Sequence, residues 1–366
     1  MSSMTTPPAT GTVEISWFSA LCDDDAEFLG TQDPAYLSTF EHCKDIVDAA
    51  EAGGFDNILL PSGFSLGIDP VAFAGGVAPT VKNMRLLLAV RCGEMWPPQL
   101  ARQIATLDQM LGGRLTVNII SSDMPGQTME SAPRYGRTLE AMEIIRTLLD
   151  GKPVDIDGEH YQMQLDPMRI GTVSGKCPPF YFGGMSPAAR EVAAKGADVF
   201  LMWPDTKDKV QALVDDMRER AANHGRELKF GYRVHVIVRE TEEEARAHAR
   251  HIMSKLDVEE GEKLRARALD ATSEGVRRQA MMRDGADDEG FAEENLWTGI
   301  GKARSGCGAA IVGNPHQVAA KLEMYREMGF SAFILSGYPH AREAEYFSRL
   351  VLPKINHGPL LNARSL

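Results

Sequence analysis

The chain has 366 residues, of which 43% are hydrophobic and 25% charged, as in an ordinary globular protein that folds in water. With 39 Lys and Arg against 51 Asp and Glu its formal net charge is −12, which argues against nucleic-acid and membrane partners because both require a basic surface. The five cysteines are widely spaced and form no C-x-x-C pair, so we expect neither a zinc site nor disulfides, and a reducing, cytoplasmic location.

Short apolar segments alternate along the chain with helix-like ones. The apolar segments are predicted as strands, in chain order 13–18, 55–62, 84–91, 114–120, 178–184, 197–203, 230–240 and 331–337. The intervening segments are predicted as helices, in chain order 34–54, 69–79, 97–113, 134–151, 187–196, 206–225 and 315–329. Nearly continuous apolar strands are typical of a parallel sheet that is buried on both faces. Eight βα units therefore predict an α/β fold, a TIM-like (β/α)8 barrel, with a doubly wound open sheet as the competing fold.

The expected barrel is one domain over residues 13–353, between a polar, disordered tail at 1–12 and a C-terminal tail at 354–366. Two insertions interrupt the βα pattern at its rim. Residues 152–177 are predicted to contain a small hairpin turning at Asp157-Gly158. Residues 240–308 form a longer, charged and helical segment, which is typical of a lid over a barrel site.

Several catalytic or binding motifs are isolated or incomplete. Residues 63–67 read G-x-S-x-G, the pattern around a hydrolase nucleophile, so a serine hydrolase that uses Ser65 is the alternative enzyme class. Residues 299–304 do not form a dinucleotide motif, because Arg304 stands in place of its third glycine. No metal site is expected either, since His248 and His251 lack a carboxylate partner in a recognised pattern.

Polar or aromatic residues follow the predicted strands where barrels carry their chemistry. Residues 181–187, YFGGMSP, end a strand in two glycines and begin a helix at Ser186. Free amides, a capping hydroxyl and the positive end of a helix dipole favour a phosphate site there, although a plain turn with a serine cap has the same pattern. Trp203 ends another strand, and Tyr338 and His340 follow the last one.

The strand at 230–240 carries Arg233 and His235 two residues apart, so both side chains point to the same face. A buried guanidinium without a counter-charge is unfavourable, so we expect an anion to meet Arg233. That anion is either a buried carboxylate or a substrate. Arg304 lies in a Gly/Ser-rich segment, where it is solvated unless the loop closes over an anionic ligand.

The chain resembles the alkanesulfonate monooxygenases of the bacterial luciferase-like family in five segments: LARQIATLDQMLGGRLTVNIISSD, PPFYFGGMSPAA, FGYRVHVIVRETEEEA, NLWTGIGKARSGCGAAIVG and FILSGYPH. The similarity extends over nearly the whole chain. It implies a TIM-like barrel that takes reduced FMN (FMNH2) from a separate NAD(P)H-dependent flavin reductase. With O2 as co-substrate, such enzymes cleave the C–S bond of an organosulfonate to an aldehyde and sulfite. The family forms homodimers and homotetramers.

The resemblance also implies roles for individual residues. The sulfonate and the reactive flavin are expected to be surrounded by Arg233, His235, Arg304, Tyr338, His340 and Trp203. Asn118 and Tyr135 are expected to contact the flavin, and Gly184 and Ser186 to hold its phosphate. Arginine suits a sulfonate because it is always charged and donates hydrogen bonds in a fork.

Two loops depart from the pattern of the resemblance. The loop after the first strand, WFSALCDDDAEFLG, lacks the usual His, and the loop after the second strand, PSGFSLGID, lacks a frequent Cys. Asp23 to Asp25 and Ser62 to Ser65 supply polar groups that are suited to sugar hydroxyls. We therefore expect a polar sulfonate such as the sulfosugar sulfoquinovose. A linear alkanesulfonate, or the chemistry of another luciferase-like flavin monooxygenase, is the alternative.

Overall fold

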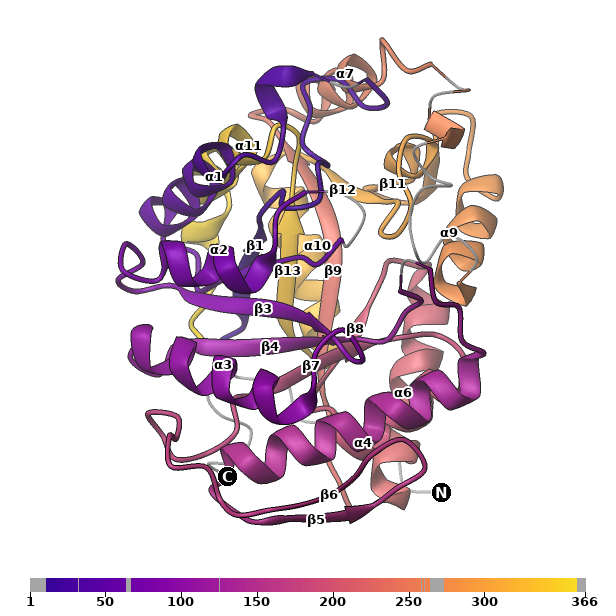
Figure 1. The fold of residues 1–366 in the computed structure, drawn as a ribbon. Helices are drawn as coiled ribbons and strands as arrows, with labels where there is room; N and C mark the ends of the chain where they lie inside the picture. The colour runs from indigo at the N-terminus through magenta and orange to yellow at the C-terminus, as the bar shows by residue number, and fades with distance from the viewer. Residues whose placement is uncertain are drawn as a thin grey trace.

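Eight parallel strands close into a barrel (Figure 1). In their order around the barrel they are β1 (Glu14–Phe18), β2 (Asn57–Leu60), β3 (Arg85–Arg91), β4 (Leu115–Ile120), β7 (Phe180–Gly183), β8 (Val199–Met202), β9 (Lys229–Val238) and β13 (Phe330–Ser336). The ring closes because β9 pairs with both β8 and β13, and β13 pairs with β1. This computed structural model describes residues 11–31, 33–63, 67–124, 126–257, 259, 261–263 and 273–360. It confirms the predicted (β/α)8 barrel and each of its predicted strands.

Helices cover the outside of the barrel and mostly follow the predicted ranges. They are α1 (Phe40–Gly53), α2 (Pro70–Val77), α3 (Pro97–Met110), α4 (Ser131–Leu149), α5 (Pro187–Gly196), α6 (Lys207–Asn223), α10 (Pro315–Glu327) and α11 (His340–Leu350). The predicted helix at 34–54 is in fact two elements, a 3-10 turn, η1 (Pro34–Tyr36), and then α1. Thr39 separates them, because it is extended and its side chain caps α1 by accepting from the amide of His42.

Two hydrophobic clusters lie on the two sides of the barrel wall, because side chains alternate along each strand. One cluster packs the strands against the helices. The other fills the barrel and consists of Phe18, Leu59, Leu87, Ala89, Tyr181, Val199, Ala332, Ile334 and Leu360. Leu360 belongs to the expected C-terminal tail, yet it is buried and its N–H donates to the buried carboxylate of Glu14 at 3.0 Å. This contact closes the N-terminal end of the barrel and leaves the C-terminal ends of the strands for a site.

Both insertions lie outside the barrel wall. The first contains the predicted antiparallel hairpin, β5 (Val154–Asp157) and β6 (Gln162–Leu165), which packs against α4. The second contains α7 (Glu242–Ile252), α9 (Glu274–Asp284), β10 (Phe291–Glu293), β11 (Leu296–Trp297) and η2 (Gly299–Lys302). After it, β12 (Ala310–Gly313) pairs in parallel with β9, and β11 pairs with β12. The second insertion is therefore partly strand, where the sequence predicted helix.

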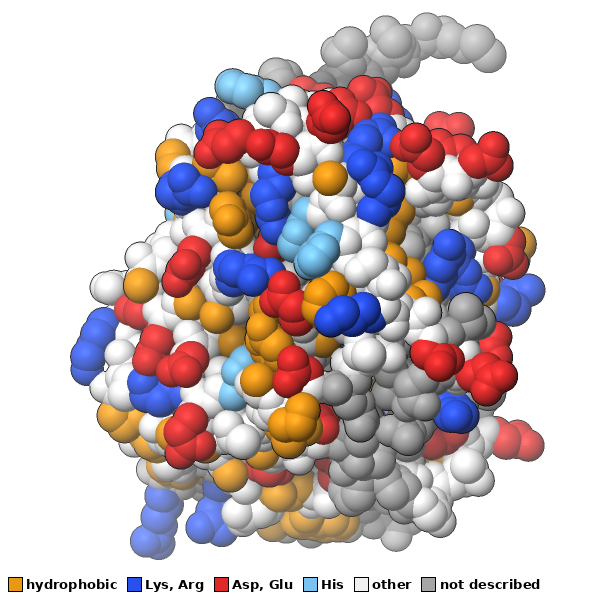
Figure 2. All heavy atoms as spheres, turned by 90° about the horizontal axis from the view of Figure 1, so that it is seen from above, with side chains coloured by type: hydrophobic (Ala, Val, Ile, Leu, Met, Phe, Trp, Pro, Cys, Tyr) orange, Lys and Arg blue, Asp and Glu red, His pale blue; other side chains and the backbone are white. Residues whose placement is uncertain are grey.

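The composition argued against nucleic-acid and membrane partners, and the surface charge and the helix lengths are the structural features that concern this expectation. On the face that Figure 2 shows, acidic and basic side chains are interspersed, and among the described residues there neither sign forms a continuous field. In the described ranges, no helix is long and apolar enough to cross a bilayer. Nor do the described residues bring three His, Cys, Asp or Glu side chains together as metal ligands.

Candidate active site

A cavity of about 850 Å³ lies at the C-terminal ends of the barrel strands. It is lined by these predicted site residues: Asn118, Tyr135, Gly184, Ser186, Trp203, Arg233, Arg304 and Tyr338. The other two predicted residues, His235 and His340, are fully buried. Their ring centres lie 5.3 Å and 5.0 Å from that of Tyr338. The two imidazoles therefore support Tyr338, and it is Tyr338 that faces the cavity.

Arg233 is a buried cation on β9 that lines this cavity, and it is 5% exposed. Its Nη2 donates to Ser336 Oγ at 2.8 Å, and its Nη1 donates to main-chain carbonyls. Its guanidinium carbon lies 4.4 Å from the centre of the Phe18 ring. No carboxylate in the described part of the chain forms an ion pair with it, so the expected buried counter-ion is not provided by the described residues. Burial lowers the pKa of Arg233.

The length of β9 explains how a residue in the middle of a strand reaches the barrel rim. The neighbouring β8 ends at Met202, opposite Tyr232, and β13 ends at Ser336, opposite His235. Arg233 and His235 therefore lie level with the ends of the adjacent strands. Beyond them β9 continues to Val238 and pairs with β12 instead. The pair thus sits at the end of the barrel where catalysis takes place in this architecture.

A chain of hydrogen bonds links Arg233 to His235. Ser336 Oγ accepts from Arg233 and lies 2.7 Å from His235 Nδ1. His235 Nε2 is 3.2 Å from the carbonyl oxygen of Cys307, to which it can only donate. Nδ1 is therefore the acceptor, and the Ser336 hydroxyl donates to it. Burial and the charge of Arg233 hold the pKa of His235 well below its ordinary value, so this imidazole is neutral.

Arg304 reaches Tyr338 from the loop that follows η2. Its Nη1 donates to Tyr338 Oη at 2.6 Å and lies 3.3 Å from Asp24 Oδ2. Burial raises the pKa of Tyr338 to about 12, even though the charge of Arg304 opposes this shift. The phenol is therefore protonated at neutral pH. Because its oxygen accepts from Arg304, its own proton is available to a ligand in the cavity.

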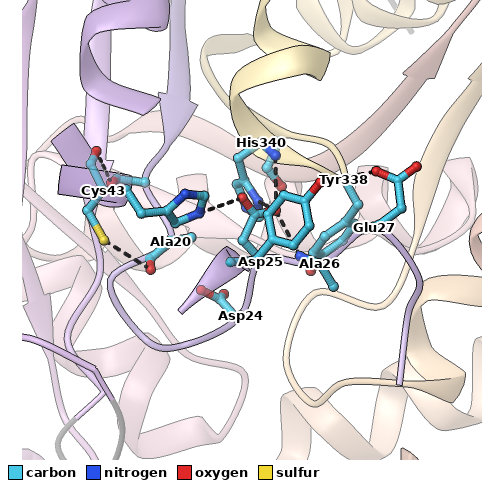
Figure 3. A network of polar contacts seen from close by, with 12 residues as sticks. Ala20, Asp24, Asp25, Ala26, Glu27, Cys43, Tyr338 and His340 are labelled. Atoms are coloured by element: carbon cyan, nitrogen blue, oxygen red, sulfur yellow. Dashed lines mark hydrogen bonds and ion pairs between the residues drawn. The ribbon is translucent and has the colours of Figure 1, made fainter. Parts of the chain in front are cut away.

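Asp25 joins His340 to His42, and Figure 3 shows Asp25 beside His340. Its Oδ1 accepts from His340 Nδ1 at 2.8 Å, from the His340 amide at 3.0 Å and from the Ala26 amide at 2.9 Å. Its Oδ2 lies 3.0 Å from His42 Nε2. Burial opposes ionisation, but the charge and hydrogen bonds of His340 hold the pKa of Asp25 far below its ordinary value. The Asp25 carboxylate in turn raises the pKa of His42 through their hydrogen bond.

The turn between β7 and α5 lies at the cavity wall and has no room for a side chain at Gly184. A Cβ on Gly184 would lie 2.5 Å from Ala189 Cβ and 3.4 Å from Tyr135 Oη, so a side chain does not fit there. Ser186 caps α5 by accepting from the Ala189 amide at 3.2 Å, and both Gly184 and Ser186 line the cavity. The positive end of the α5 dipole therefore lies at the cavity wall, where it favours an anion such as a phosphate.

Trp203, at the end of β8, connects the barrel to the second insertion. A Cβ on Gly275, in the first turn of α9, would lie 2.9 Å from the Trp203 ring. A Cβ on Gly306, in the loop of Arg304, would lie 3.6 Å from the same ring. The indole thus packs against both segments of the insertion that line the cavity.

The model of the luciferase-like monooxygenase family matches residues 23–332. The chain belongs to this family. It is 63% identical to the sulfoquinovose monooxygenase of Novosphingobium aromaticivorans, over 95% of this chain and 98% of that protein. It is 52% identical to the sulfoquinovose monooxygenase of Agrobacterium fabrum, over 98% of this chain and 95% of that protein. A crystal structure of riboflavin lyase with modified FMN and riboflavin has the same fold, with a TM-score of 0.77 at 16% identity over 97% of this chain and 95% of that chain.

This luciferase-like monooxygenase also has cavity residues that sequence reasoning missed. Arg91 ends β3, donates to Ser122 Oγ and to the Ser62 carbonyl, and pairs with Glu94 at 2.6 Å. Its place at the C-terminal end of a barrel strand is the signal that could have identified it. No local pattern could have paired Asp25 with His340, because 315 positions separate them.

Ser65, the nucleophile of the alternative serine-hydrolase prediction, lies outside the described residues. The residue just before that gap, Gly63, lines the cavity, so the loop after β2 borders the site. The expected disordered tail at 1–12 also lies outside the described residues, apart from positions 11 and 12.

Proposed function

We propose that this chain is an FMNH2-dependent monooxygenase that uses O2 to cleave the C–S bond of sulfoquinovose, releasing sulfite and leaving an aldehyde. Membership of the luciferase-like monooxygenase family supports the reaction class. The two sulfoquinovose monooxygenases that match nearly end to end, at 63% and 52% identity, support the substrate.

The observation that carries this proposal is the unpaired charge of Arg233. The other arginines that line the cavity each have a carboxylate partner: Arg91 has Glu94, Arg134 has Asp123 and Arg304 has Asp24. Arg233 has none among the described residues, although it is almost fully buried. A buried cation needs an anion, and a sulfonate is a permanent anion whose oxygens match the forked donors of a guanidinium. Arg233 is therefore assigned to the sulfonate of the substrate.

The other substrate-side residues have complementary tasks. Tyr338 donates a hydrogen bond or a proton to the reacting oxygen. Arg304 and Trp203 hold the second insertion over the cavity and keep water out during the reaction. His235 and His340, which the sequence predicted as catalytic, stay predicted site residues. Their contacts support a positioning role, His235 for Arg233 and His340 for Tyr338.

The turn after β7 fits the phosphate of FMN. A side chain at Gly184 would clash with Ala189, so the backbone stays bare at the cavity wall, and Ser186 with the N-terminus of α5 offers donors to an anion. Asn118 and Tyr135 line the same cavity and are assigned to the flavin. When bound, reduced FMN would supply the two electrons with which O2 yields one oxygen atom for the aldehyde and one for water.

A separate NAD(P)H-dependent reductase is assigned the task of supplying FMNH2. The support is that residues 299–304 lack the glycine pattern of a dinucleotide site. Assembly as a homodimer or homotetramer stays a prediction.

Sulfite release tests the proposed function. The purified chain, given a flavin reductase, NADH, FMN and O2, should release sulfite from sulfoquinovose and far less from octanesulfonate. Leaving out the reductase, FMN or O2 should abolish release, because the reductase transfers the electrons of NADH to FMN, FMN carries them, and O2 supplies the oxygen atoms. Release from octanesulfonate alone would contradict the substrate, and no release from any sulfonate would contradict the reaction.

A further inference from the structure

Ser336 is the last residue of β13 and lies directly beside the arginine that is assigned to the sulfonate. Its register partner on β9 is His235, and Arg233 lies two residues before His235 on the same face of that strand. Ser336 Oγ lies 2.8 Å from Arg233 Nη2 and 2.7 Å from His235 Nδ1. Because Ser336 is fully buried, it can act on a ligand only through these two neighbours.

The donor and the acceptor of each hydrogen bond in this group follow from the residue types. An arginine only donates, so Ser336 Oγ accepts from Arg233. Because His235 is neutral and donates from Nε2 to the Cys307 carbonyl, its Nδ1 can only accept. The hydroxyl proton of Ser336 therefore points to His235, and the hydroxyl oxygen stays an acceptor for Arg233.

Neutral acceptors hold one side of the Arg233 guanidinium. Nη2 donates to Ser336, and Nη1 donates to the carbonyl oxygens of Val234 at 3.1 Å and of Ile334 at 3.5 Å. The guanidinium carbon lies 4.4 Å from the centre of the Phe18 ring. A guanidinium has more N–H groups than these contacts use, and Arg233 lines the cavity, so donors remain for a ligand.

A hydroxyl group orients Arg233 without neutralising it. The other arginines that line the cavity are paired with carboxylates, which both orient and neutralise a guanidinium. A carboxylate at position 336 would do the same to Arg233 and would compete with a sulfonate for its donors. Serine supplies an acceptor and no negative charge, so the positive charge stays available to a ligand.

We infer that Ser336 is a positioning residue that aims the guanidinium of Arg233 at the sulfonate while leaving its charge unopposed. This inference rests on the proposed function and deepens it. It also gives His235 a specific task, which is to hold the hydroxyl proton of Ser336 away from Arg233. The hydrogen bond from His235 to Cys307 joins this group to the loop that carries Arg304.

Sulfite release from sulfoquinovose, with flavin reductase, NADH, FMN and O2 present, tests this role. Ser336→Ala should lower kcat/KM by about 10-fold or more, because Arg233 loses an acceptor and can turn away from the sulfonate. The same substitution in an Arg233→Ala protein should change kcat/KM by less than about 2-fold, because Ser336 acts only through that arginine. FMN affinity, measured by fluorescence titration, should be unchanged in Ser336→Ala.

Ser331→Ala is the matched control. Ser331 lies near the opposite end of β13, is partly buried and donates to the Phe230 carbonyl at 3.5 Å. The substitution therefore removes one hydroxyl group from the same strand at a position that does not line the cavity. Its kcat/KM should equal that of the wild-type chain.

The tautomer of His235 can be measured on the wild-type chain, which avoids any folding defect of the variants. NMR of the imidazole nitrogens should find this ring neutral, with its proton on Nε2. A proton on Nδ1 would contradict the inference, because Ser336 could then not donate to that nitrogen.

Wild-type kcat/KM in a folded Ser336→Ala protein would overturn the inference. Equal losses from Ser336→Ala with and without Arg233 would also overturn it, because the serine would then support the barrel rather than the arginine. Absence of sulfite with the wild-type chain would instead overturn the proposed function, so the two failures are distinguishable.

Discussion

Charged residues in and around the cavity differ in whether they have hydrogen-bond and ion-pair partners within the protein, and their roles differ accordingly. Asp25 accepts hydrogen bonds on both oxygens and anchors His340. Arg233 is also buried, but it has no carboxylate partner among the described residues. A fully satisfied buried ion maintains structure, whereas an unsatisfied one needs a ligand. We therefore treat Asp25 as a positioning residue and Arg233 as a substrate contact.

Replacement of Asp25 should reveal its structural task. Asp25→Asn should lower the free energy of unfolding by about 2–4 kcal/mol at pH 7, because the amide loses the charge and turns a donor toward an imidazole. The pKa of Asp25 is depressed in the folded chain, so its stabilisation is present above the ordinary value of 3.8 and is lost as the pH falls below it. In urea unfolding, the difference in the free energy of unfolding between wild type and Asp25→Asn should thus be constant near neutral pH. It should become smaller below about pH 4.

His42→Gln is the control for Asp25→Asn, since it replaces the half-buried imidazole with a neutral amide that can still donate to Oδ2. It should cost less than about 1 kcal/mol. A stability difference for Asp25→Asn that does not narrow in acid would contradict the role of the carboxylate charge.

Elements that are buried on both faces could be predicted, and elements that depend on partners could not. The eight barrel strands read as apolar runs because helices cover one side and the barrel interior the other. The four residues of β12 are a strand because β9 continues beyond the barrel, a pairing that no local pattern contains. Helix α11 was not among the predicted helices, although it buries Ala344 and Phe347 at helical spacing and is amphipathic.

Part of the candidate site could also be predicted from the sequence. Side chains at strand ends, such as Trp203 and Tyr338, were found because barrel architecture places them at the cavity. The orientation of His235 and His340 behind Tyr338 depends on strand register and on the start of α11, which the sequence does not define.

The turn between β7 and α5 provides a test of the assigned phosphate site. Gly184→Ala should weaken FMN binding by about 10-fold or more, because the new Cβ would clash with Ala189 Cβ and shift the start of α5. Fluorescence titration of FMN measures this. Gly171→Ala is the matched control, since a Cβ there meets nothing within 4 Å. Equal FMN affinity in Gly184→Ala and the wild-type chain would contradict the assigned phosphate site.

The whole molecule is a barrel closed at one end and open to a ligand at the other. The C-terminal segment closes the floor through Leu360 and Glu14, and the second insertion covers the rim through Trp203. The net charge of −12 does not favour an anionic substrate, so recognition of a sulfonate depends on a few local cations. The pattern of eight βα units predicted the barrel. It could not predict that one arginine among those lining the cavity would have no carboxylate partner in the described part of the chain.

The role of the Arg233 charge is tested most directly by sulfite release from sulfoquinovose. The assay compares Arg233→Ala with the wild-type chain and Arg233→Lys. We predict a loss of about 100-fold or more in kcat/KM for the alanine variant and a smaller loss for lysine, which keeps the charge without the fork. The alanine protein should remain folded and at least as stable, because a buried cation has been removed. Wild-type turnover by a folded Arg233→Ala protein would contradict the assignment of Arg233 to the sulfonate.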